Sequence, residues 1–435
     1  MSRESDILVI GAGAVGLACA YFLNRAGRSV RVIDRDEPGR GTSFGNCGLI
    51  TPSHATPMCS PTNLRAGVTS IFSPAAPLHV RPRLNLDFLR WVSRYSAQCT
   101  TERASEVMAA KAELLRSSRA LMERLIRKEK LHCEWSPSGL LAVANSGKGL
   151  ASLERLAEEA ARVDVATQVV DATAARELEP ALLDTIVGGV LFPDDAVLRP
   201  DLYCTELARV CREKGVRFEK EAEVDGIRVG DAGEAHAIST AKDVYRAPIV
   251  VFATGVWSRS LLRQIGFNAP IEPGKGYTLT SARPNPCPTR ALLLEERRIA
   301  VTPWGDSFRL GGTMEFAGFD EGINRHRVDA LIEGAAEYLG EPLAPGKPEA
   351  WAGFRPMTPD DLPLIGPLED QPGLFLACGH NMLGMSMSVA TGRLIAELVL
   401  RRKPHLDPAP YAPNRFARQP ANPLVGLVRQ LSQRD

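Results

Sequence analysis

Residues 6–16, DILVIGAGAVG, decide the fold of this chain. Their first half is a short apolar run of the kind that forms a buried parallel strand. Glycines at positions 11, 13 and 16 follow at once with GxGxxG spacing, and the next residues have helical character up to Gly27. Residues 29–34, SVRVID, then predict a second strand that ends at Asp34. The stretch therefore predicts a strand–helix–strand unit with a glycine-rich first turn.

This order of strand, glycine motif, helix, strand and acid is typical of a dinucleotide-binding unit. The glycines allow a tight turn, a close approach of the backbone to a pyrophosphate, and close helix–strand packing. The helix N-terminus offers N–H groups and a positive dipole to the diphosphate, and the Asp34 carboxylate can accept hydrogen bonds from ribose hydroxyls. The motif alone does not separate FAD from NAD, and an ordinary βαβ turn is the plain structural alternative.

Composition and charge exclude several classes of function. The chain has 435 residues, which is enough for two domains. Its 52 basic and 51 acidic residues nearly cancel, so we expect no nucleic-acid partner. Nine cysteines without a CxxC pair and seven histidines without a cluster predict reduced thiols, a cytoplasmic location and no metal site. We also expect no signal peptide and no membrane-spanning helix, because the apolar runs are short.

A second stretch helps to choose between the dinucleotides. Residues 245–255, YRAPIVVFATG, predict a strand that runs into Ala253, Thr254 and Gly255. Such an ending, far downstream of the first unit, resembles the second nucleotide-contacting strand of flavoproteins with two dinucleotide folds, in which small residues let the chain pass close to the cofactor. A buried strand followed by a glycine turn is the plain alternative.

Further segments carry a more specific signal. They are residues 34–50 (DRDEPGRGTSFGNCGLI), 273–279 (PGKGYTL), 299–302 (IAVT), 309–315 (RLGGTME), 351–360 (WAGFRPMTPD) and 378–384 (CGHNMLG). Together they resemble the FAD-dependent D-amino acid oxidase superfamily, and most closely its bacterial D-amino acid dehydrogenase branch. The segments keep the order of the family from residue 6 to about 400, and the resemblance is weaker at 52–85 and after 405.

The resemblance implies an α/β fold with two interleaved domains. One is a Rossmann-type FAD-binding domain, and the other is an α+β substrate domain built on a mixed, mainly antiparallel sheet. We expect the FAD-binding domain at 1–85, 186–267 and 351–410, the substrate domain at 86–185 and 268–350, and a C-terminal tail at 411–435. Helical spacing predicts a helical insertion at 86–135, and strand-like runs predict the sheet at 139–144, 277–282, 299–304 and 308–313.

The resemblance also implies which residues surround the cofactor. The residues expected to bind FAD are Gly11, Gly13, Ala14, Val15, Gly16, Asp34, Arg35, Thr42, Ser43, Asn46, Gly48, Leu49, Val224, Ala253, Thr254, Gly255, Gly379, His380, Asn381, Leu383 and Gly384. Thr42 and Ser43 would donate hydroxyls to the pyrophosphate, and Asn46 would lie near the flavin ring, unless this stretch is a plain polar turn. Residues 385–400 predict a helix whose N-terminus would stabilise negative charge near the flavin.

Three residues are candidates for catalysis: Arg355, Tyr277 and His380. The guanidinium of Arg355 would hold a substrate carboxylate by two parallel charge-assisted hydrogen bonds, with a domain-interface salt bridge as the alternative. The Tyr277 hydroxyl would hold the same carboxylate, or else its ring is packed in a sheet. His380 could add a contact, although a lone histidine is more often structural. No general base stands out, and the sequence does not place His54.

The activity implied by the resemblance is the oxidation of a D-amino acid by hydride transfer from Cα to flavin N5. An imino acid and then a 2-oxo acid would result, and the electrons would pass to a quinone or another acceptor. Glycine, sarcosine, a cyclic imino acid such as D-hydroxyproline, and a 2-hydroxy acid stay open as substrates, because the same arginine would hold each of them. An NAD-dependent dehydrogenase and an FAD-binding module without activity are the rival classes.

Residues 52–80 are the least family-like part of the chain. They combine several prolines with apolar residues that include Ile71 and Phe72, which is too apolar for an ordinary solvated loop and too interrupted for one helix. The segment predicts either an apolar patch or a loop folded onto the protein's own surface. With a patch, the enzyme would be peripheral on the cytoplasmic face of the inner membrane.

Overall fold

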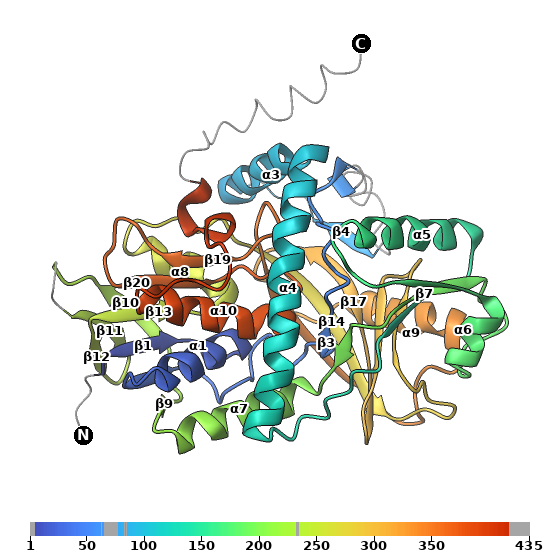
Figure 1. The fold of residues 1–435 in the computed structure, drawn as a ribbon, viewed down its shortest axis with the longest axis horizontal. Helices are drawn as coiled ribbons and strands as arrows, with labels where there is room; N and C mark the ends of the chain where they lie inside the picture. Colours follow the sequence, from blue (N-terminus) through green and yellow to red (C-terminus); the bar gives the residue numbers. More distant parts are fainter. Residues whose placement is uncertain are drawn as a thin grey trace, which may run out of the picture.

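The chain is described from a computed structural model, whose described residues are 5–61, 63–64, 77–81, 83, 85–231 and 235–416. Two sheets form the two halves of the molecule, and one long helix runs along their junction (Figure 1). The half with the N-terminus contains the strand–helix–strand unit, and the other half contains the larger sheet. This α/β arrangement agrees with the fold class expected from the sequence.

The described residues of the first half form a six-stranded sheet. Its strands, in spatial order, are β19 (Leu364–Pro367), β20 (Leu374–Cys378), β13 (Ile249–Phe252), β1 (Ile7–Ile10), β2 (Val30–Ile33) and β9 (Arg217–Glu219). All neighbours are parallel except β19, and β1 lies between β2 and β13. Every residue of β1 is buried, as expected for a central strand that is covered on both faces.

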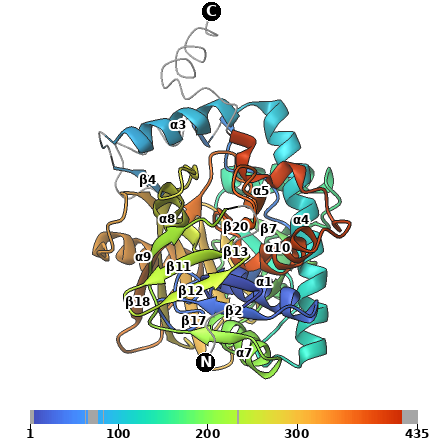
Figure 2. The same ribbon diagram turned by 90° about the vertical axis from the view of Figure 1, so that its left-hand side faces the viewer.

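The two faces of this sheet pack against different layers, because successive residues of a strand point in opposite directions. Ile7 and Val9 belong to a core with the helices on one face, and Leu8 and Ile10 belong to a core with a small meander on the other. The helices are α1 (Ala14–Arg25), α7 (Pro200–Glu213) and α10 (Gly384–Val399). The other layer contains α8 (Ser258–Arg263) and the strands β10 (Val224–Arg228), β11 (His236–Thr240) and β12 (Val244–Ala247), seen in front in Figure 2.

The described residues of the second half form a nine-stranded, mainly antiparallel sheet. Its main path is β18 (Glu349–Met357), β14 (Glu272–Ala282), β17 (Ser307–Phe316), β16 (Ile299–Pro303), β15 (Ala291–Leu294), β5 (Leu140–Ala144), β7 (Gly188–Phe192) and β6 (Gln168–Asp171), and β4 (Leu78–Val80) pairs with β17. Only the β15–β5 and β17–β4 pairs are parallel among these strands. The mixed sheet expected for the substrate domain is therefore present, including the strands expected near 139–144, 277–282, 299–304 and 308–313.

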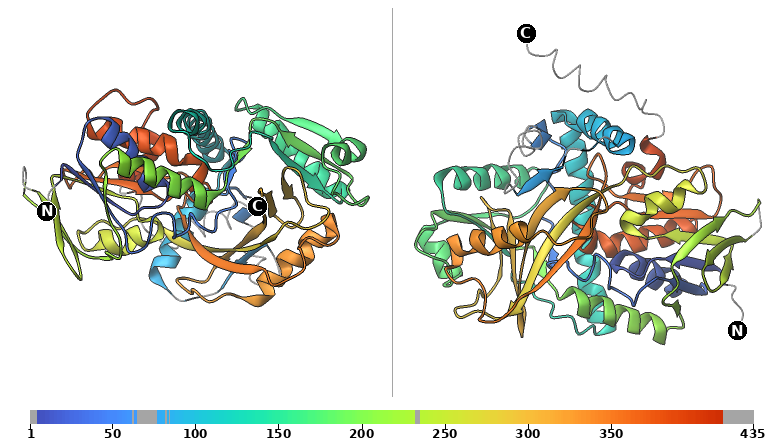
Figure 3. Two further views of the ribbon diagram at one scale, coloured as in Figure 1. Left: turned by 90° about the horizontal axis from the view of Figure 1, so that it is seen from below. Right: turned by 180° about the vertical axis from the view of Figure 1, so that it is seen from behind.

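Helices cover the large sheet and bridge the two halves (Figure 3). The bridging helices are α3 (Leu86–Gln98) and α4 (Thr101–Glu129), and those beside the large sheet are α5 (Gly147–Ala161), α6 (Ala172–Leu178) and α9 (Arg325–Leu339). Asn85 caps α3 by accepting from the N–H groups of Asp87 and Phe88, and Thr100 caps α4. The helical insertion predicted over 86–135 is confirmed.

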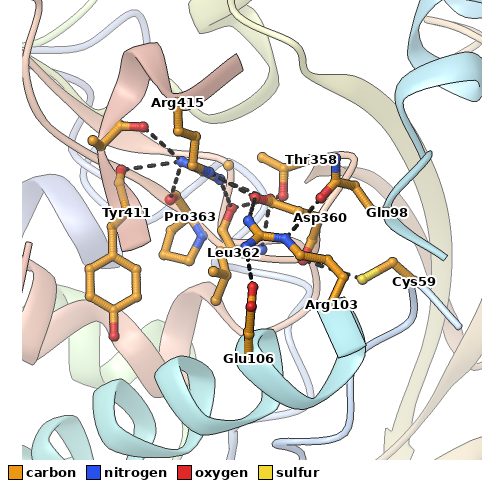
Figure 4. Close-up of polar contacts among 12 residues, drawn as sticks. Cys59, Gln98, Arg103, Glu106, Thr358, Asp360, Leu362, Pro363, Tyr411 and Arg415 are labelled. Atoms are coloured by element: carbon orange, nitrogen blue, oxygen red, sulfur yellow. Dashed lines mark hydrogen bonds and ion pairs between the residues drawn. The ribbon is translucent and has the colours of Figure 1, made fainter. Parts of the chain in front are cut away.

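A buried ionic cluster joins Arg415, near the end of the described residues, to the junction of the two halves (Figure 4). Arg415 donates from Nε to Oδ2 of Asp360 at 2.7 Å and from Nη2 to Oδ1 at 2.8 Å, which is a bidentate pair. Arg103 of α4 approaches the same fully buried carboxylate at 3.7 Å. Residues 411–416 thus pack on the first half although a tail was expected from 411 onward, and the rest of that tail lies outside the described residues.

The domain limits drawn from the sequence stay a prediction, which strand pairing now refines. β7 lies within the expected FAD-binding segment 186–267 but pairs with β5 in the large sheet. β8 (Ala196–Val197) follows β7 and pairs with β3 (Leu49–Ile50) in a separate two-stranded sheet. We therefore place the passage from the second half to the first half after β7, because β9 is the next strand that joins the six-stranded sheet.

Candidate active site

A cavity of about 520 Å³ opens at the carboxyl ends of β1 and β13 and extends to the face of β14 and β17. Ligands of open α/β sheets bind outside the carboxyl ends of the strands, so the cavity lies where the fold class predicts a site. Its wall takes residues from both halves of the molecule, and its volume is within the usual range of ligand sites.

The turn after β1 brings backbone to the wall of the cavity. Gly11 has a φ of +102°, and a Cβ added there would lie 2.5 Å from the carbonyl oxygen of Ala253, so only glycine fits. Gly16 lies behind the wall, where an added Cβ would be 1.9 Å from the Gly11 oxygen. The two glycines therefore serve the turn and the helix packing, and α1 points its N-terminus at the cavity.

The Asp34 carboxylate at the end of β2 is fixed by two backbone donors. Its Oδ2 accepts from the N–H of Ala12 at 2.5 Å, and its Oδ1 accepts from the N–H of Asp36 at 2.9 Å. Burial raises the pKa of Asp34 above its usual value, and the backbone donors oppose that effect. Each carboxylate oxygen keeps a second lone pair, so the group can also accept hydrogen bonds from a ligand's hydroxyls.

The segment after β13 adds three residues to the wall of the cavity at the carboxyl ends of the strands, which we call the nucleotide end because the glycine turn lies there. Ala253, Thr254 and Gly255 line the cavity, and an added Cβ at Gly255, whose φ is +53°, would meet nothing within 4 Å. Farther along the wall, the Arg35 guanidinium stacks 4.2 Å from the ring centroid of Trp257. This stack gives a flat surface against which a planar ring could lie.

The loop between β2 and β3 places two hydroxyls at the wall, and both have partners within the protein. Ser43 Oγ accepts from the N–H of Ala14, the first residue of α1, at 3.1 Å, and it also lies within hydrogen-bond reach of the Cys204 thiol. The Thr42 hydroxyl donates to the carbonyl oxygen of Phe354 at 3.0 Å. Its only proton is used within the protein, which departs from the expected donation to a pyrophosphate.

Arg309 of β17 holds the middle of the same loop. Its Nη1 donates to the carbonyl oxygens of Phe44 at 2.9 Å and Asn46 at 2.7 Å. Asn46 Oδ1 accepts from the N–H of Gly48 at 2.7 Å, and an added Cβ at Gly48 would be 1.9 Å from the Leu198 oxygen. Asn46 therefore lines the cavity while its side chain stabilises the loop, and Gly48 lies behind the wall.

Strand β18 presents one face to the substrate end of the cavity. Trp351, Gly353 and Arg355 alternate along it and all line the wall. A Cβ added at Gly353 would lie 2.0 Å from the Trp351 ring, and one added at Gly276 of β14 would lie 2.1 Å from Nη1 of Arg355. The two glycines thus leave room for the indole ring and for the guanidinium.

Arg355 carries a positive charge into this end of the cavity. Its Nη1 donates to the Thr313 carbonyl oxygen at 2.8 Å, and among the described residues no carboxylate forms an ion pair with it. Burial lowers the pKa of Arg355, but a guanidinium stays charged in proteins. Because a buried cation without a counter-charge is costly, the site is suited to an anionic group of a ligand.

Tyr277 lines the cavity, but its hydroxyl has a partner within the protein. The side chain is fully buried, and its hydroxyl donates to Oε2 of Glu315 at 2.6 Å. Burial, together with Glu315, raises the pKa of Tyr277. This arrangement differs from the expected contact between the Tyr277 hydroxyl and a substrate carboxylate, since Glu315 takes the only hydroxyl proton.

His380 and Asn381 shape the turn that leads into α10. His380 is buried with Nε2 at 2.9 Å from Oγ1 of Thr391, and burial lowers its pKa to about 3, so the ring is neutral. Asn381 Oδ1 accepts from the N–H of Thr358 at 2.7 Å. Gly379 lies behind the wall, whereas Leu383 and Gly384 line it at the start of α10. The N-terminus of α10 therefore faces the cavity, and His380 is held by the helix.

A model of the FAD-dependent oxidoreductase family known as DAO matches residues 6–398. The chain belongs to this family. It is also 34% identical to a D-amino acid dehydrogenase of Granulibacter bethesdensis over 423 residues, covering 94% of this chain and 99% of that protein. A D-amino acid dehydrogenase of Sinorhizobium medicae is 33% identical, with the same coverage of both chains.

Solved structures agree on the fold of this family. The glycine oxidase of Geobacillus kaustophilus superposes with a TM-score of 0.77 at 23% identity, over 95% of this chain and 99% of that one. The L-proline dehydrogenase of P. horikoshii superposes with a TM-score of 0.73 at 20% identity, over 96% and 99%. These likenesses support a Rossmann-type FAD-binding half joined to a second half with a mixed sheet.

The residues of the nucleotide end fit FAD, the cofactor of this family. The turn at Gly11 and Gly13 with the N-terminus of α1 would hold the pyrophosphate, and the fixed carboxylate of Asp34 would accept from the ribose. The open space at Gly255 is a cradle that any side chain would fill. The flavin end would then lie between the start of α10 and the face of β14 and β18.

Most residues chosen from the sequence meet at this one cavity. Those in its wall are Gly11, Gly13, Ala14, Val15, Asp34, Arg35, Thr42, Ser43, Asn46, Leu49, Val224, Ala253, Thr254, Gly255, Tyr277, Arg355, His380, Asn381, Leu383 and Gly384. Sequence reasoning missed Trp257 and Trp351 and left His54 unplaced. Trp351 had a usable signal, because it lies two and four residues before Gly353 and Arg355 on one strand face.

Proposed function

We propose that the chain is an FAD-dependent D-amino acid dehydrogenase, which oxidises the amino acid to an imino acid that water converts to a 2-oxo acid. The observation that carries the proposal is the Arg355 guanidinium, which lines the substrate end of the cavity without a carboxylate partner among the described residues. The similarity to D-amino acid dehydrogenases over nearly the whole chain supports the substrate class.

The planar fork of Arg355 would hold the substrate carboxylate in a fixed orientation. The bond from Nη1 to the Thr313 oxygen keeps the guanidinium plane in place before substrate binds. Trp351 would close the same face and exclude water. Bound FAD supplies the acceptor for the hydride that leaves Cα. The contribution of the chain is to fix which bond of the substrate points toward that acceptor.

A second substrate class is favoured by the names of the structural neighbours. Glycine oxidase and L-proline dehydrogenase share the fold, so glycine, sarcosine or a cyclic imino acid such as D-hydroxyproline is the alternative. Each of these has the same carboxylate for Arg355. They differ from a larger D-amino acid in how much of the cavity beside Trp351 they would fill.

The electron acceptor is proposed to be a quinone, with peripheral contact to the cytoplasmic face of the inner membrane. Among the helices of the described residues, none combines the length and the apolar character needed to cross a membrane. The described ends of segment 52–80 pack on the protein, with Leu64 against the helical core and β4 in the large sheet. Ile71 and Phe72, which carry the predicted patch, lie outside the described residues.

A screen for anaerobic bleaching of the flavin tests the proposed activity. Purified protein with bound FAD is mixed with single D-amino acids, L-amino acids, glycine, sarcosine and D-hydroxyproline, and the visible spectrum is followed. Rapid bleaching by a D-amino acid and not by its L-enantiomer supports the proposal. Bleaching by the cyclic imino acid alone selects the alternative, and no bleaching by any of them contradicts both.

The acceptor is tested by a comparison of turnover with oxygen and with a soluble quinone. Turnover with quinone that far exceeds turnover with oxygen is expected. The variant with Ile71→Ser and Phe72→Ser should pellet less with membrane vesicles than the unchanged protein. Rapid turnover with oxygen and release of peroxide, with equal pelleting of both proteins, would instead identify a soluble oxidase.

A further inference from the structure

A chain of three hydrogen-bonded side chains connects the buried interior to the substrate cavity. Ser53 donates from Oγ to Oδ2 of Asp195 at 2.5 Å and from its N–H to Oδ1 at 3.1 Å. The same Oγ lies 3.0 Å from Nδ1 of His54. Asp195 and Ser53 are 1% and 2% exposed, whereas His54 lines the cavity. The chain thus begins at a buried carboxylate and ends at an imidazole on the wall.

The order of donors fixes the tautomer of His54. A serine hydroxyl has one proton, and beside an ionised carboxylate that proton is donated to the carboxylate. Ser53 Oγ then acts as the acceptor toward His54, so Nδ1 carries the imidazole proton. The other nitrogen, Nε2, is left with a lone pair as the ring atom that can contact a ligand. A neutral nitrogen base is therefore part of the cavity wall.

We propose that Nε2 of His54 accepts a proton from the ammonium group of the substrate, and that Ser53 and Asp195 draw this proton into the protein. The inference rests on the proposed function, because it needs a substrate with a protonated amine. It also supplies the general base that the sequence did not reveal. His54 would be the catalytic residue, with Ser53 and Asp195 as positioning residues that act through it.

The step balances without any oxidant. One N–H bond of the ammonium breaks and an Nε2–H bond forms on His54. The Nδ1 proton passes to Ser53 Oγ, and the serine's own proton passes to Oδ2 of Asp195. The substrate is then a neutral amine, from which the Cα hydride can leave. His54 is neutral again with its proton on Nε2, and Asp195 has become a carboxylic acid.

The charges around the chain drive the proton in this direction. Burial, together with the positive charges of Lys111 and Arg298, lowers the pKa of His54 to about 4, so the proton does not stay on the imidazole. Burial raises the pKa of Asp195 to about 7, although the Ser53 hydrogen bonds oppose the shift. Asp194 adds to that rise and Arg119 opposes it. Near neutral pH the carboxylate can therefore both accept the proton and release it.

The tautomer is tested in the enzyme without substrate, by nitrogen NMR of protein labelled at histidine. In alkaline solution the His54 signal, assigned by its absence in His54→Gln, should show a proton on Nδ1. In Asp195→Asn the new amide donates to Ser53 Oγ, so the hydroxyl turns toward Nδ1 and the proton should move to Nε2. An Asp195→Asn spectrum with the proton still on Nδ1 overturns the inferred order of donors.

The proton transfer is tested by the pH dependence of anaerobic flavin bleaching. In the unchanged enzyme the rate constant should rise with pH through about 7, because Asp195 has to be ionised to accept the proton. In Asp195→Asn the rate at neutral pH should fall about 10²–10⁴-fold, the usual contribution of a general base. The loss should shrink in alkaline solution, where the substrate already carries a neutral amine.

The neighbouring exposed carboxylate provides the matched control. Asp194→Asn removes a charge next to the chain but none of its hydrogen bonds, so the rate should still rise with pH, with the rise moved slightly toward lower pH. Propionate, which has a carboxylate and no amine, should bind equally well to both variants because Arg355 is untouched. An unaltered pH profile in Asp195→Asn overturns the relay while the proposed function stands. Absence of bleaching in the unchanged enzyme overturns the proposed function, and the NMR result then still decides whether the tautomer is as inferred.

Discussion

At the scale of single residues, the role proposed for Arg355 depends on both the charge and the planar shape of its guanidinium. We expect Arg355→Lys to lower kcat/KM by about 10²-fold or more, since lysine keeps the charge but loses the planar fork that orients the carboxylate. Flavin content should stay unchanged, because Arg355 lies at the substrate end. Steady-state kinetics and the flavin absorbance of the purified variant measure both. Arg393→Lys on the outer part of α10 is the control, and equal losses in the two variants would remove Arg355 from the clamp.

Asp34 gives a second prediction at this scale, which concerns the cofactor. Asp34→Ala removes the carboxylate that we expect to bind the ribose, and hydrogen bonds to a charged group contribute about 1.5–3 kcal/mol. The FAD dissociation constant should therefore rise about 10- to 150-fold. Asp34→Asn keeps an oxygen for the Ala12 N–H and should lose less affinity. Titration of the FAD-free proteins by fluorescence decides the point, and unchanged binding in Asp34→Ala would contradict the assignment.

The site residues that could be predicted from the sequence make contacts within one local unit, whereas those that were missed contact residues far away in the sequence. The glycine turn and Asp34 could be predicted because the contacts between them are set by a local strand–helix–strand unit. Ser53 and Asp195 could not, since their contact joins residues 142 positions apart and depends on how the two halves meet. The hydroxyl directions of Thr42 and Tyr277 were missed for a related reason. Their partners, Phe354 and Glu315, come from distant strands.

At the scale of elements, the close contact of α1 with α10 keeps the cofactor turn in place. Gly392 of α10 faces Ala18 of α1, where an added Cβ would lie 2.5–2.8 Å from three atoms of that residue. Gly392→Ala should therefore cost about 1–3 kcal/mol of unfolding free energy by overpacking. Gly147→Ala at the start of α5 is the control, because its new Cβ would meet nothing within 4 Å. Urea unfolding of both variants measures the difference in their unfolding free energies. Equal unfolding free energies would show that α1 and α10 can move apart without cost.

The strands and helices were easier to predict than the partners with which each of them pairs or packs. Strands β1 and β13 and helices α4 and α10 follow from runs of apolar residues with the period of each structure. The position of β7 in the large sheet does not follow, because its apolar run GGVLF suits either sheet. Pairing with β5 decides the matter, and that contact is tertiary.

At the scale of the whole molecule, a buried ion pair ties the helical insertion to the FAD-binding half. Lys111 of α4 donates to Asp361 at 2.5 Å, and the two side chains are 3% and 4% exposed. Lys111→Met leaves that carboxylate buried without its partner, so it should cost about 3–5 kcal/mol, much of which Asp361→Asn should recover in the double variant. Arg127→Met, at an exposed pair on the same helix, should cost less than about 1 kcal/mol. Urea unfolding of the single and double variants gives the coupling energy between Lys111 and Asp361. A coupling energy of zero would contradict the prediction.

The central position of β1 has a consequence for how the protein is made. β1 ends at Ile10, but its neighbour β13 begins only at Ile249, and β20, which pairs with β13, ends at Cys378. During synthesis the edge of β1 that pairs with β13 therefore stays unpaired until the residues up to Phe252 have been translated. Contacts that distant in sequence form slowly, and an exposed strand edge invites aggregation. Loading of FAD must wait until Gly384 at the start of α10 has been translated, because the nascent chain has no complete FAD site before then.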